Sequence, residues 1–233
     1  MASGVASFFL ATALFLAHSH ANLAGLAPEG LEAVPGFSYS GNNGPDKWGS
    51  LSPIYAPCSK GKWQSPIDID KDKVVLNKTL KPLVSNYYPT NATLVDPELH
   101  LVHKASDGGF SVVAVLYKLG HPDPIVAKVQ RKLSELEKEV RSRHEVVAQV
   151  AVGTFETQKL KRHPHKYYRY GGSLTTPPCS ESVIWHVLAK VRSISREQVE
   201  ALDAPLESTC KRNCRPVQPL NGRRVELFDD QLA

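Results

Sequence analysis

PELHLVH at residues 97–103 and FSVVAVLY at residues 110–117 are the two stretches that decide the fold class of this 233-residue chain. Apolar and polar residues alternate in the first stretch, the second is almost continuously apolar, and Asp107-Gly108-Gly109 lies between them. Alternation with a period of two and a short apolar run bounded by glycines are both typical of β-strands. The sequence therefore predicts two strands joined by a turn.

The rest of the chain contains further strand patterns and one clear helix. Strands are expected around residues 146–152, 167–173 and 183–191. Apolar residues recur with a period of 3.6 through Pro124–Arg143, opposite charged residues, which predicts a helix with its apolar stripe in the core. Residues 22–57 are rich in Gly, Pro, Asn and Ser and are typical of an irregular arm lying over a domain. Together these patterns predict a β-rich α+β domain.

The composition is that of one ordinary globular domain. Hydrophobic residues make up 42% and charged residues 22% of the chain, which excludes disordered and fibrous classes. The net charge of +5, from 28 basic and 23 acidic residues, is mild for this size. We therefore expect no nucleic-acid partner, because such proteins carry a dense basic face.

The N-terminus has the pattern of a secretory signal. An uncharged apolar run at Val5–Ala17 precedes the small-x-small motif Ser19-His20-Ala21, and no charged residue occurs before Glu29. The run is too short to span a bilayer comfortably. We interpret residues 1–21 as a signal peptide rather than a buried helix, and expect entry into the secretory pathway, with an extracellular or organellar destination. No other apolar stretch reaches membrane length.

The cysteines and two sequons agree with secretion. An even number of cysteines in an oxidising compartment predicts disulfides, and four of them allow three pairings. The four are Cys58, Cys179, Cys210 and Cys214. A zinc site at the C-x3-C pair is disfavoured, because no partner His or Cys lies nearby in the sequence. The triplets that begin at Asn77 and Asn91 are candidate glycosylation sites.

Three segments carry candidate chemistry. Period-two geometry puts Glu98 and His100 on one face of a strand, where the histidine could bind a metal or be a hydrogen-bonded core residue. Thr175 and Thr176 precede a Pro-Pro turn and could present hydroxyls to a small polar ligand or form a surface turn. The basic run at 161–166 contains two histidines, but a solvated loop is the favoured interpretation.

Five motifs together resemble the α-class carbonic anhydrases, in particular the secreted plant-type members. In the order typical of the family they are YSGNNGPDKWG at 39–49, QSPIDI at 64–69, ELHLVH at 98–103, YGGSLTTPP at 170–178 and RPVQPLN at 215–221. The resemblance spans nearly all of residues 37–228. It implies a single domain around a central, mostly antiparallel, twisted sheet, and zinc-dependent reversible hydration of CO2 to bicarbonate and a proton.

The resemblance also implies roles for individual residues. His100 matches one of three zinc-binding histidines, and Glu98 matches a carboxylate that orients a zinc ligand. Thr175 matches the hydroxyl that orients zinc-bound hydroxide, with Thr176 beside it. The residues that match the apolar wall of the CO2 pocket are Val102, Val112, Leu174, Val183 and Trp185. Tyr39 and Ser65 match supporting polar positions of the pocket, and Cys58 and Cys179 match a disulfide.

One block of the family pattern is missing between Val95 and Glu98. In the family, the stretch that matches residues 91–95 continues through several strands before ELHLVH. Those strands carry a His-x-His pair and the Glu that accepts the Thr hydroxyl proton. We therefore expect this chain to lack several central strands and two of three zinc ligands. His163 and His165 are not expected to replace them, because the resemblance places their segment away from the metal.

Three functional hypotheses remain open on these grounds. The chain is a zinc-dependent carbonic anhydrase, a non-catalytic secreted binding or storage protein on the same scaffold, or a truncated splice product without independent function. All three share one predicted organisation: signal peptide 1–21, N-terminal arm 22–36, carbonic-anhydrase-like domain 37–228 and C-terminal tail 229–233.

Overall fold

The computed structural model describes residues 36–83, 91–95, 100–104, 109–127, 130, 149–154, 164–204 and 214–232. The helical elements are η1 (Gly41–Asn43), α1 (Trp48–Leu51), η2 (Pro53–Tyr55), α2 (Pro57–Lys60) and α4 (Arg196–Asp203). The strands are β1 (Val75–Leu76), β2 (Asn91–Val95), β3 (His100–Lys104), β4 (Phe110–Ala114), β5 (Tyr117–Leu119), β6 (Gln149–Thr154), β7 (Lys166–Ser173), β8 (Glu181–Leu188), β9 (Arg192–Ile194) and β10 (Glu226–Asp229).

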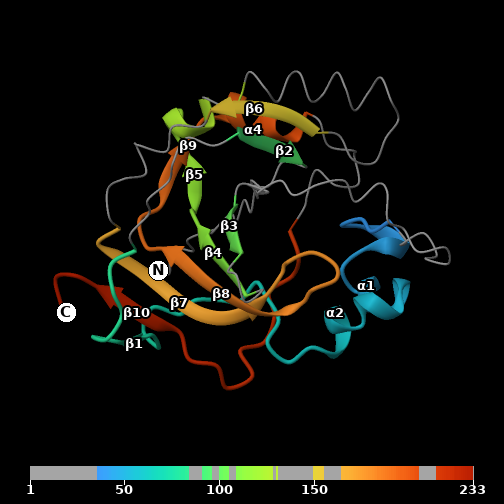
Figure 1. Cartoon of the computed structure of the whole chain (residues 1–233), viewed down its shortest axis with the longest axis horizontal. Coiled ribbons are helices and arrows are strands. Elements are labelled where there is room, and N and C mark those ends of the chain that lie inside the picture. The colour runs from blue at the N-terminus through green and yellow to red at the C-terminus, as the bar shows by residue number, and fades with distance from the viewer. Residues whose placement is uncertain are drawn as a thin grey trace, which may run out of the picture.

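A twisted six-stranded sheet forms the centre of the molecule, in the order β1-β10-β7-β8-β4-β3 (Figure 1). The pairs β3–β4, β7–β8 and β10–β7 are antiparallel, whereas β4–β8 and β1–β10 are parallel. The predicted pair of strands around residues 100–114 is confirmed, with Val102 opposite Val112 and His103 opposite Ser111. Two further pairs, β2–β6 and β5–β9, complete the sheets of the described residues. The fold is thus α+β around a central mixed sheet.

Two of the predicted strands end earlier than expected, because the chain leaves the central sheet at these points and its next strand pairs in a separate sheet. The run at 110–117 forms β4 only to Ala114, and Tyr117 then begins β5, which pairs in parallel with β9. The run at 183–191 likewise ends as β8 at Leu188, before β9 begins. β4 and β8 end side by side, since Ala114 and Val187 are register partners. Local periodicity does not reveal the change of partner between β4 and β5, because residues 110–117 form one continuous apolar run.

Two clusters of buried side chains make up the core. The larger lies on one face of the central sheet and comprises Ile67, Val112, Ala114, Tyr168, Tyr170, Val183, Trp185, Val187 and Val225. The smaller comprises Trp48, Tyr55, Cys58 and Cys179, with Phe37, Tyr39 and Leu51 packed against it. The disulfide between Cys58 of α2 and Cys179, in the loop after β7, joins the N-terminal helices to the sheet. The pairing that the family resemblance implies is thereby confirmed.

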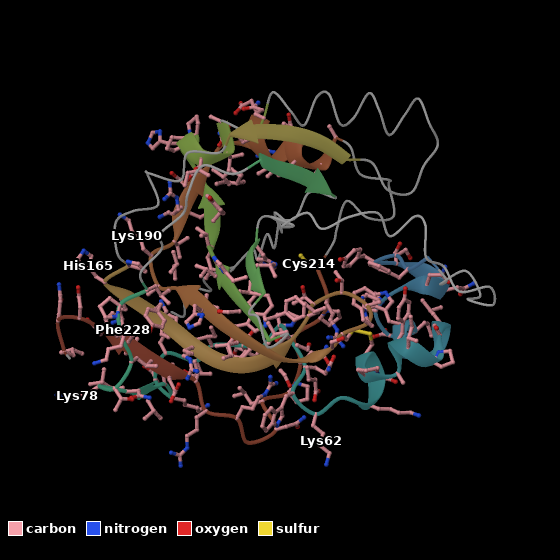
Figure 2. The ribbon with its side chains drawn as sticks, viewed as in Figure 1. Lys62, Lys78, His165, Lys190, Cys214 and Phe228 are labelled. Atoms are coloured by element: carbon pink, nitrogen blue, oxygen red, sulfur yellow. A yellow bond between two sulfur atoms is a disulfide. The ribbon has the colours of Figure 1, made fainter. Side chains whose placement is uncertain are left out.

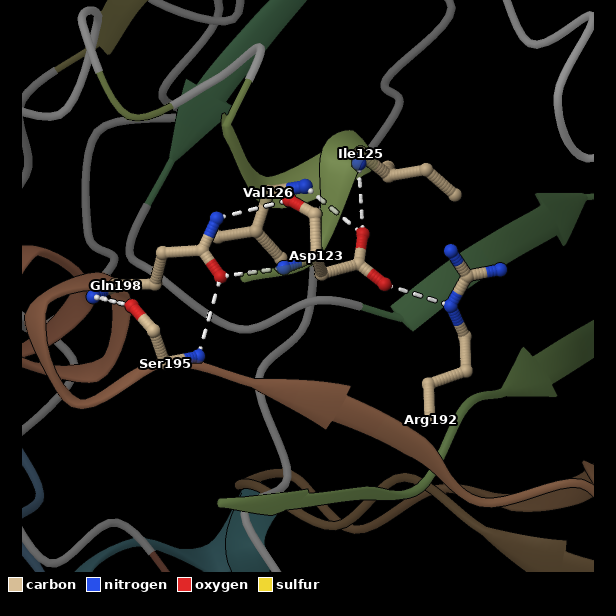
Figure 3. A network of polar contacts seen from close by, with 6 residues as sticks. All are labelled: Asp123, Ile125, Val126, Arg192, Ser195 and Gln198. Atoms are coloured by element: carbon tan, nitrogen blue, oxygen red, sulfur yellow. Dashed lines mark hydrogen bonds and ion pairs between the residues drawn. The ribbon is translucent and has the colours of Figure 1, made fainter. Parts of the chain in front are cut away.

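A buried polar network joins residues 123–126 to α4 (Figure 3). Gln198 of α4 donates from Nε2 to the carbonyl of Asp123 at 2.8 Å, and its Oε1 accepts from the Asp123 N–H at 2.7 Å. Sequence analysis missed α4, although Ser195 and Gln198 form a capping box that marks its start. The predicted helix at 124–143 is helical at 124–127 and 130, and the rest lies outside the described residues.

The opposite face of the sheet holds a half-buried histidine. His186 of β8 lies with its Nδ1 3.3 Å from the Ser111 Oγ of β4 and packs edge-on against the Tyr167 ring. Burial lowers the pKa of His186 to about 4 from 6.5, with smaller contributions from the charges of Arg169 and His103. The folded protein therefore holds this imidazole neutral at pH values where the unfolded chain is protonated.

This difference predicts a loss of stability on acidification that depends on His186. Above pH 6.5 the imidazole is neutral in both states, and between pH 6.5 and about 4 only the unfolded chain gains the proton. We expect His186→Gln to reduce the fall in unfolding free energy between pH 7 and pH 5 by about 1 kcal/mol, after discounting for solvent screening. Urea unfolding followed by tryptophan fluorescence measures it. His121→Gln, at an exposed histidine, is the matched control and should behave as wild type. An equal fall in unfolding free energy for wild type and both variants would contradict the role of His186.

Several predictions of the sequence analysis lie outside the described residues. These include the signal peptide at 1–21, Glu98, His163 and Cys210. Asp229, the first residue of the predicted tail, is buried as the last residue of β10 and pairs with Lys166 at 2.9 Å. Within the described ranges, no helix has the length and apolar content needed to cross a bilayer.

Candidate functional site

His100 is the first residue of β3, at the end of the six-stranded sheet. It pairs with Ala114 of β4, and its side chain is 8% exposed. The imidazole packs edge-on against the Trp185 ring, with centroids 5.1 Å apart. Burial lowers the pKa of His100 to about 4, so the ring is neutral at physiological pH. The predicted face is confirmed, because His100 and Val102 point inward whereas His103 is exposed.

The predicted hydroxyl pair lies on the loop between β7 and β8. The Leu174 N–H donates to Ser180 O at 2.9 Å, and the Cys179 N–H donates to Thr176 O at 2.8 Å. The disulfide at Cys179 fixes the far end of this loop. Thr175 and Thr176 are half-buried, and the Thr175 hydroxyl has no hydrogen-bond partner among the described residues. The hydrogen bonds and the disulfide therefore fix the backbone of the loop that carries Thr175.

The residues of the predicted apolar wall gather on the same face of the sheet as His100. Val112, Val183 and Trp185 belong to the larger core cluster, and Val102 and Leu174 pack against it. Trp185 is fixed by its Nε1–H, which donates to Ser173 O at 2.9 Å, and its ring stacks with the Tyr170 ring at 6.2 Å. Tyr39 instead packs on Trp48 in the smaller cluster.

Ser65 contacts β7, the strand next to the one that carries Trp185. Its Oγ accepts from the Ser173 N–H at 3.1 Å and lies 3.3 Å from the Tyr170 hydroxyl. A Cβ on Gly172 would come within 2.2 Å of the Ser65 Oγ, so the strand needs glycine at this point. Ser65 is thus part of the scaffold that positions the strand beneath Trp185.

Sequence analysis missed a buried cation that organises the neighbouring loops. Arg215 donates from Nη1 to Gln64 Oε1 and Ser65 O, and from Nη2 to Cys58 O, each at 2.8 Å. Its guanidinium lies 5.7 Å from the centroid of the Trp48 ring, and burial lowers its pKa to about 10. Gln64 and Arg215 are the first residues of two of the five motifs, QSPIDI and RPVQPLN. Their occurrence in these motifs is the sequence feature from which a role for Arg215 could have been predicted.

The described residues do not fit a catalytic zinc ion. His100 is a neutral, buried imidazole, as a zinc ligand must be, but a catalytic site needs three protein ligands. No group of three His, Cys, Asp or Glu side chains within the described ranges could hold a metal ion. In the basic run, His165 is an exposed residue paired with Asp230. Among the described residues, the structure brings together the apolar wall and one histidine.

Comparisons with known proteins show which family this chain is similar to. Residues 96–228 match the family model for eukaryotic-type carbonic anhydrase. Alpha carbonic anhydrase 7 of Arabidopsis thaliana is 33% identical over 241 residues, covering 82% of this chain and 84% of the relative.

Two solved structures share the fold. Dioscorin complexed with ascorbate superposes with a TM-score of 0.75 at 27% identity, covering 84% of this chain and 98% of dioscorin. The α-carbonic anhydrase of Thermovibrio ammonificans with sulfanilamide has a TM-score of 0.66 at 30% identity, covering 82% and 98% of the two chains. The central sheet, its apolar wall and these matches lead to one conclusion: the chain belongs to the eukaryotic-type, or α, carbonic anhydrase family.

Proposed function

We propose that this chain is a non-catalytic member of the family, a secreted binding or storage protein that keeps the scaffold without the zinc centre. The observation that carries the proposal is that no group of three His, Cys, Asp or Glu side chains among the described residues, His100 included, could hold a metal ion. Zinc lowers the pKa of a bound water from about 16 to about 7, an effect worth about 12 kcal/mol. A single imidazole does not hold the ion in the geometry that this effect requires.

We infer that an internal deletion removed the two other zinc ligands. The alignment with Alpha carbonic anhydrase 7 runs over 241 residues, more than the whole chain of 233, yet covers only 82% of it. The relative therefore has residues without a counterpart here. Only residues 96–99 connect β2 to β3, although the two strands belong to different sheets. We propose that strands are lost between Val95 and Glu98, where the family pattern predicts the paired histidines. The uncovered residues of the relative and the short connection between β2 and β3 support this proposal.

Retained features favour a folded scaffold over a fragment without function. The disulfide, the larger core cluster and the capped helix α4 are complete within the described ranges. Dioscorin, which was solved with bound ascorbate, matches with a higher TM-score than the sulfanilamide-bound enzyme. The retained Thr175 and apolar wall are what favour the second candidate, CO2 hydration. We assign these residues to the inherited scaffold.

Metal content and CO2 hydration test the proposal on the secreted protein. After incubation with equimolar zinc and gel filtration, we expect far less than one zinc per chain and no hydration above the buffer rate in stopped flow. Stoichiometric zinc with rapid turnover would overturn the proposal. Hydrogen exchange tests the fragment hypothesis: the scaffold requires protected amides in β4, β7 and β8, and a broadly unprotected chain would reject it.

Restoring the missing segment should restore the metal site. We expect a chimera that carries the intervening segment of Alpha carbonic anhydrase 7 between Val95 and Asp96 to bind one zinc per chain. The same chimera with His100→Ala is the control and should bind at least tenfold more weakly, because one of three protein ligands is removed. Zinc affinity is measured by competition with a chromogenic chelator, and circular dichroism establishes folding. A folded chimera that binds no zinc, or binds it equally well without His100, would contradict the role of this segment.

A further inference from the structure

The β1 edge of the central sheet exposes apolar side chains. β1 is two residues long, and Val75 and Leu76 are 45% and 37% exposed. The N–H groups of Val75 and Asn77 point inward, donating to Val225 O and Leu227 O at 2.9 and 3.0 Å. The backbone of Leu76 between them therefore faces away from β10. An exposed edge with apolar side chains is a template for pairing with another chain.

The sequon Asn77-Lys78-Thr79 follows β1 directly and has a fixed geometry. Asn77 Oδ1 accepts from the Thr79 N–H at 2.9 Å and from the Thr79 hydroxyl at 2.7 Å. Asn77 Nδ2 donates to Glu226 Oε1 at 2.8 Å. Lys78 and Thr79 are exposed, and Figure 2 shows Lys78 at the margin of the molecule. The acceptor asparagine is thus anchored on the sheet while the rest of the sequon faces solvent.

The anchoring leaves one position on the amide nitrogen for a substituent. A carboxamide nitrogen carries two hydrogens, and the contact with Glu226 uses one of them. Glu226 is itself held, because its Oε2 accepts from Arg169 Nη1 of β7 at 2.8 Å. A group attached to Nδ2 would therefore sit beside the β1–β10 edge, with its attachment point oriented by two strands.

The disulfide supplies independent support for the compartment. Bridges such as Cys58–Cys179 form and persist in oxidising compartments, including the lumen where proteins enter the secretory pathway. Asparagine glycosylation of N-x-[ST] triplets takes place on secreted proteins at their surfaces. The structure brings an oxidised core and an exposed sequon together in one chain.

We propose that Asn77 carries an N-linked glycan and that this glycan covers the β1 edge. In the reaction, the bond between Asn77 Nδ2 and the sugar C1 forms, and the C1–O bond of a lipid-diphosphate-linked oligosaccharide breaks. The lipid diphosphate leaves, and the amide nitrogen gives up one proton. The bulky polar glycan then lies over Val75 and Leu76 and blocks pairing with another chain. Neither zinc binding nor its absence affects this modification.

Site-specific mass spectrometry of the full chain, secreted from a eukaryotic host, tests the modification. Treatment with a glycan-releasing amidase in heavy-oxygen water converts a glycosylated Asn77 into labelled aspartate. We expect label at Asn77 in wild type and in Thr79→Ser, which keeps the sequon, and complete loss of label in Thr79→Ala. Unlabelled Asn77 in the secreted wild-type protein would overturn the proposal.

Light scattering against concentration tests the covering role. We expect Thr79→Ala to self-associate at a concentration at least threefold lower than Thr79→Ser does. Adding Leu76→Lys to Thr79→Ala should restore the behaviour of Thr79→Ser, because a lysine on an edge strand opposes pairing. Identical scattering of the two Thr79 variants would show that the glycan does not protect this edge.

Discussion

Replacing both Cys58 and Cys179 by serine should lower the free energy of unfolding by about 5 kcal/mol. The bridge joins positions 121 residues apart, and closing a loop of that length removes much conformational entropy from the unfolded chain. Cys179 is fully buried and Cys58 nearly so, within the cluster around Trp48. A loss of this size is comparable with the whole stability of many domains. We therefore expect part of the double variant to be unfolded at 37 °C.

Denaturant unfolding measured with and without dithiothreitol gives the comparison. The reductant should lower the midpoint of wild type toward that of the double variant, while the double variant should change little. A double variant as stable as the oxidised wild type would contradict the structural role of the bridge.

Asp123→Ala should lower the free energy of unfolding by about 3 kcal/mol, because it leaves Arg192 without its partner and uncaps a helix. The Asp123 side chain is 2% exposed, and its Oδ2 accepts from Arg192 Nε at 2.7 Å. Its Oδ1 accepts from the N–H groups of Ile125 and Val126 at 2.7 and 3.2 Å (Figure 3). Asp123→Asn keeps an acceptor for the helix cap but loses the charge that pairs with Arg192. We therefore expect its free energy of unfolding to lie between that of wild type and that of Asp123→Ala.

Asp70→Ala is the matched control for this prediction. Asp70 pairs with Lys73 at 2.8 Å, but the two side chains are 38% and 80% exposed. Exposed ion pairs contribute little, so this variant should unfold at nearly the same urea concentration as wild type. Urea unfolding of the three variants measures the difference. A loss in Asp123→Ala no larger than that in Asp70→Ala would show that the buried network does not stabilise the fold.

Local patterns predicted the elements whose partners are close in sequence. The pairing of β3 with β4 and the inward face of His100 follow from alternation and a nearby turn, and both are confirmed. The change of partner between β4 and β5 could not be predicted, because it depends on β9, far along the chain. Helix α4 was within reach of prediction, since its capping box is a local signal.

The candidate site divides in the same way. Motif resemblance placed Val112, Val183 and Trp185 on one wall, and the structure brings them together. Tyr39 matched a supporting polar position of the pocket by resemblance, and its ring packs on Trp48 with centroids 5.4 Å apart. The role of Arg215 was not predicted, because its acceptors at Cys58, Gln64 and Ser65 come from the other end of the chain.

The sequence by itself determined the family, the β-rich class and the orientation of His100 on its strand, because motifs and periodicity are written in neighbouring residues. Tertiary structure alone decided how Asp123 reaches α4 and what surrounds the imidazole. Each of these contacts joins segments far apart in the chain. Such contacts form only when the whole sheet has brought the segments together, so no local pattern encodes them.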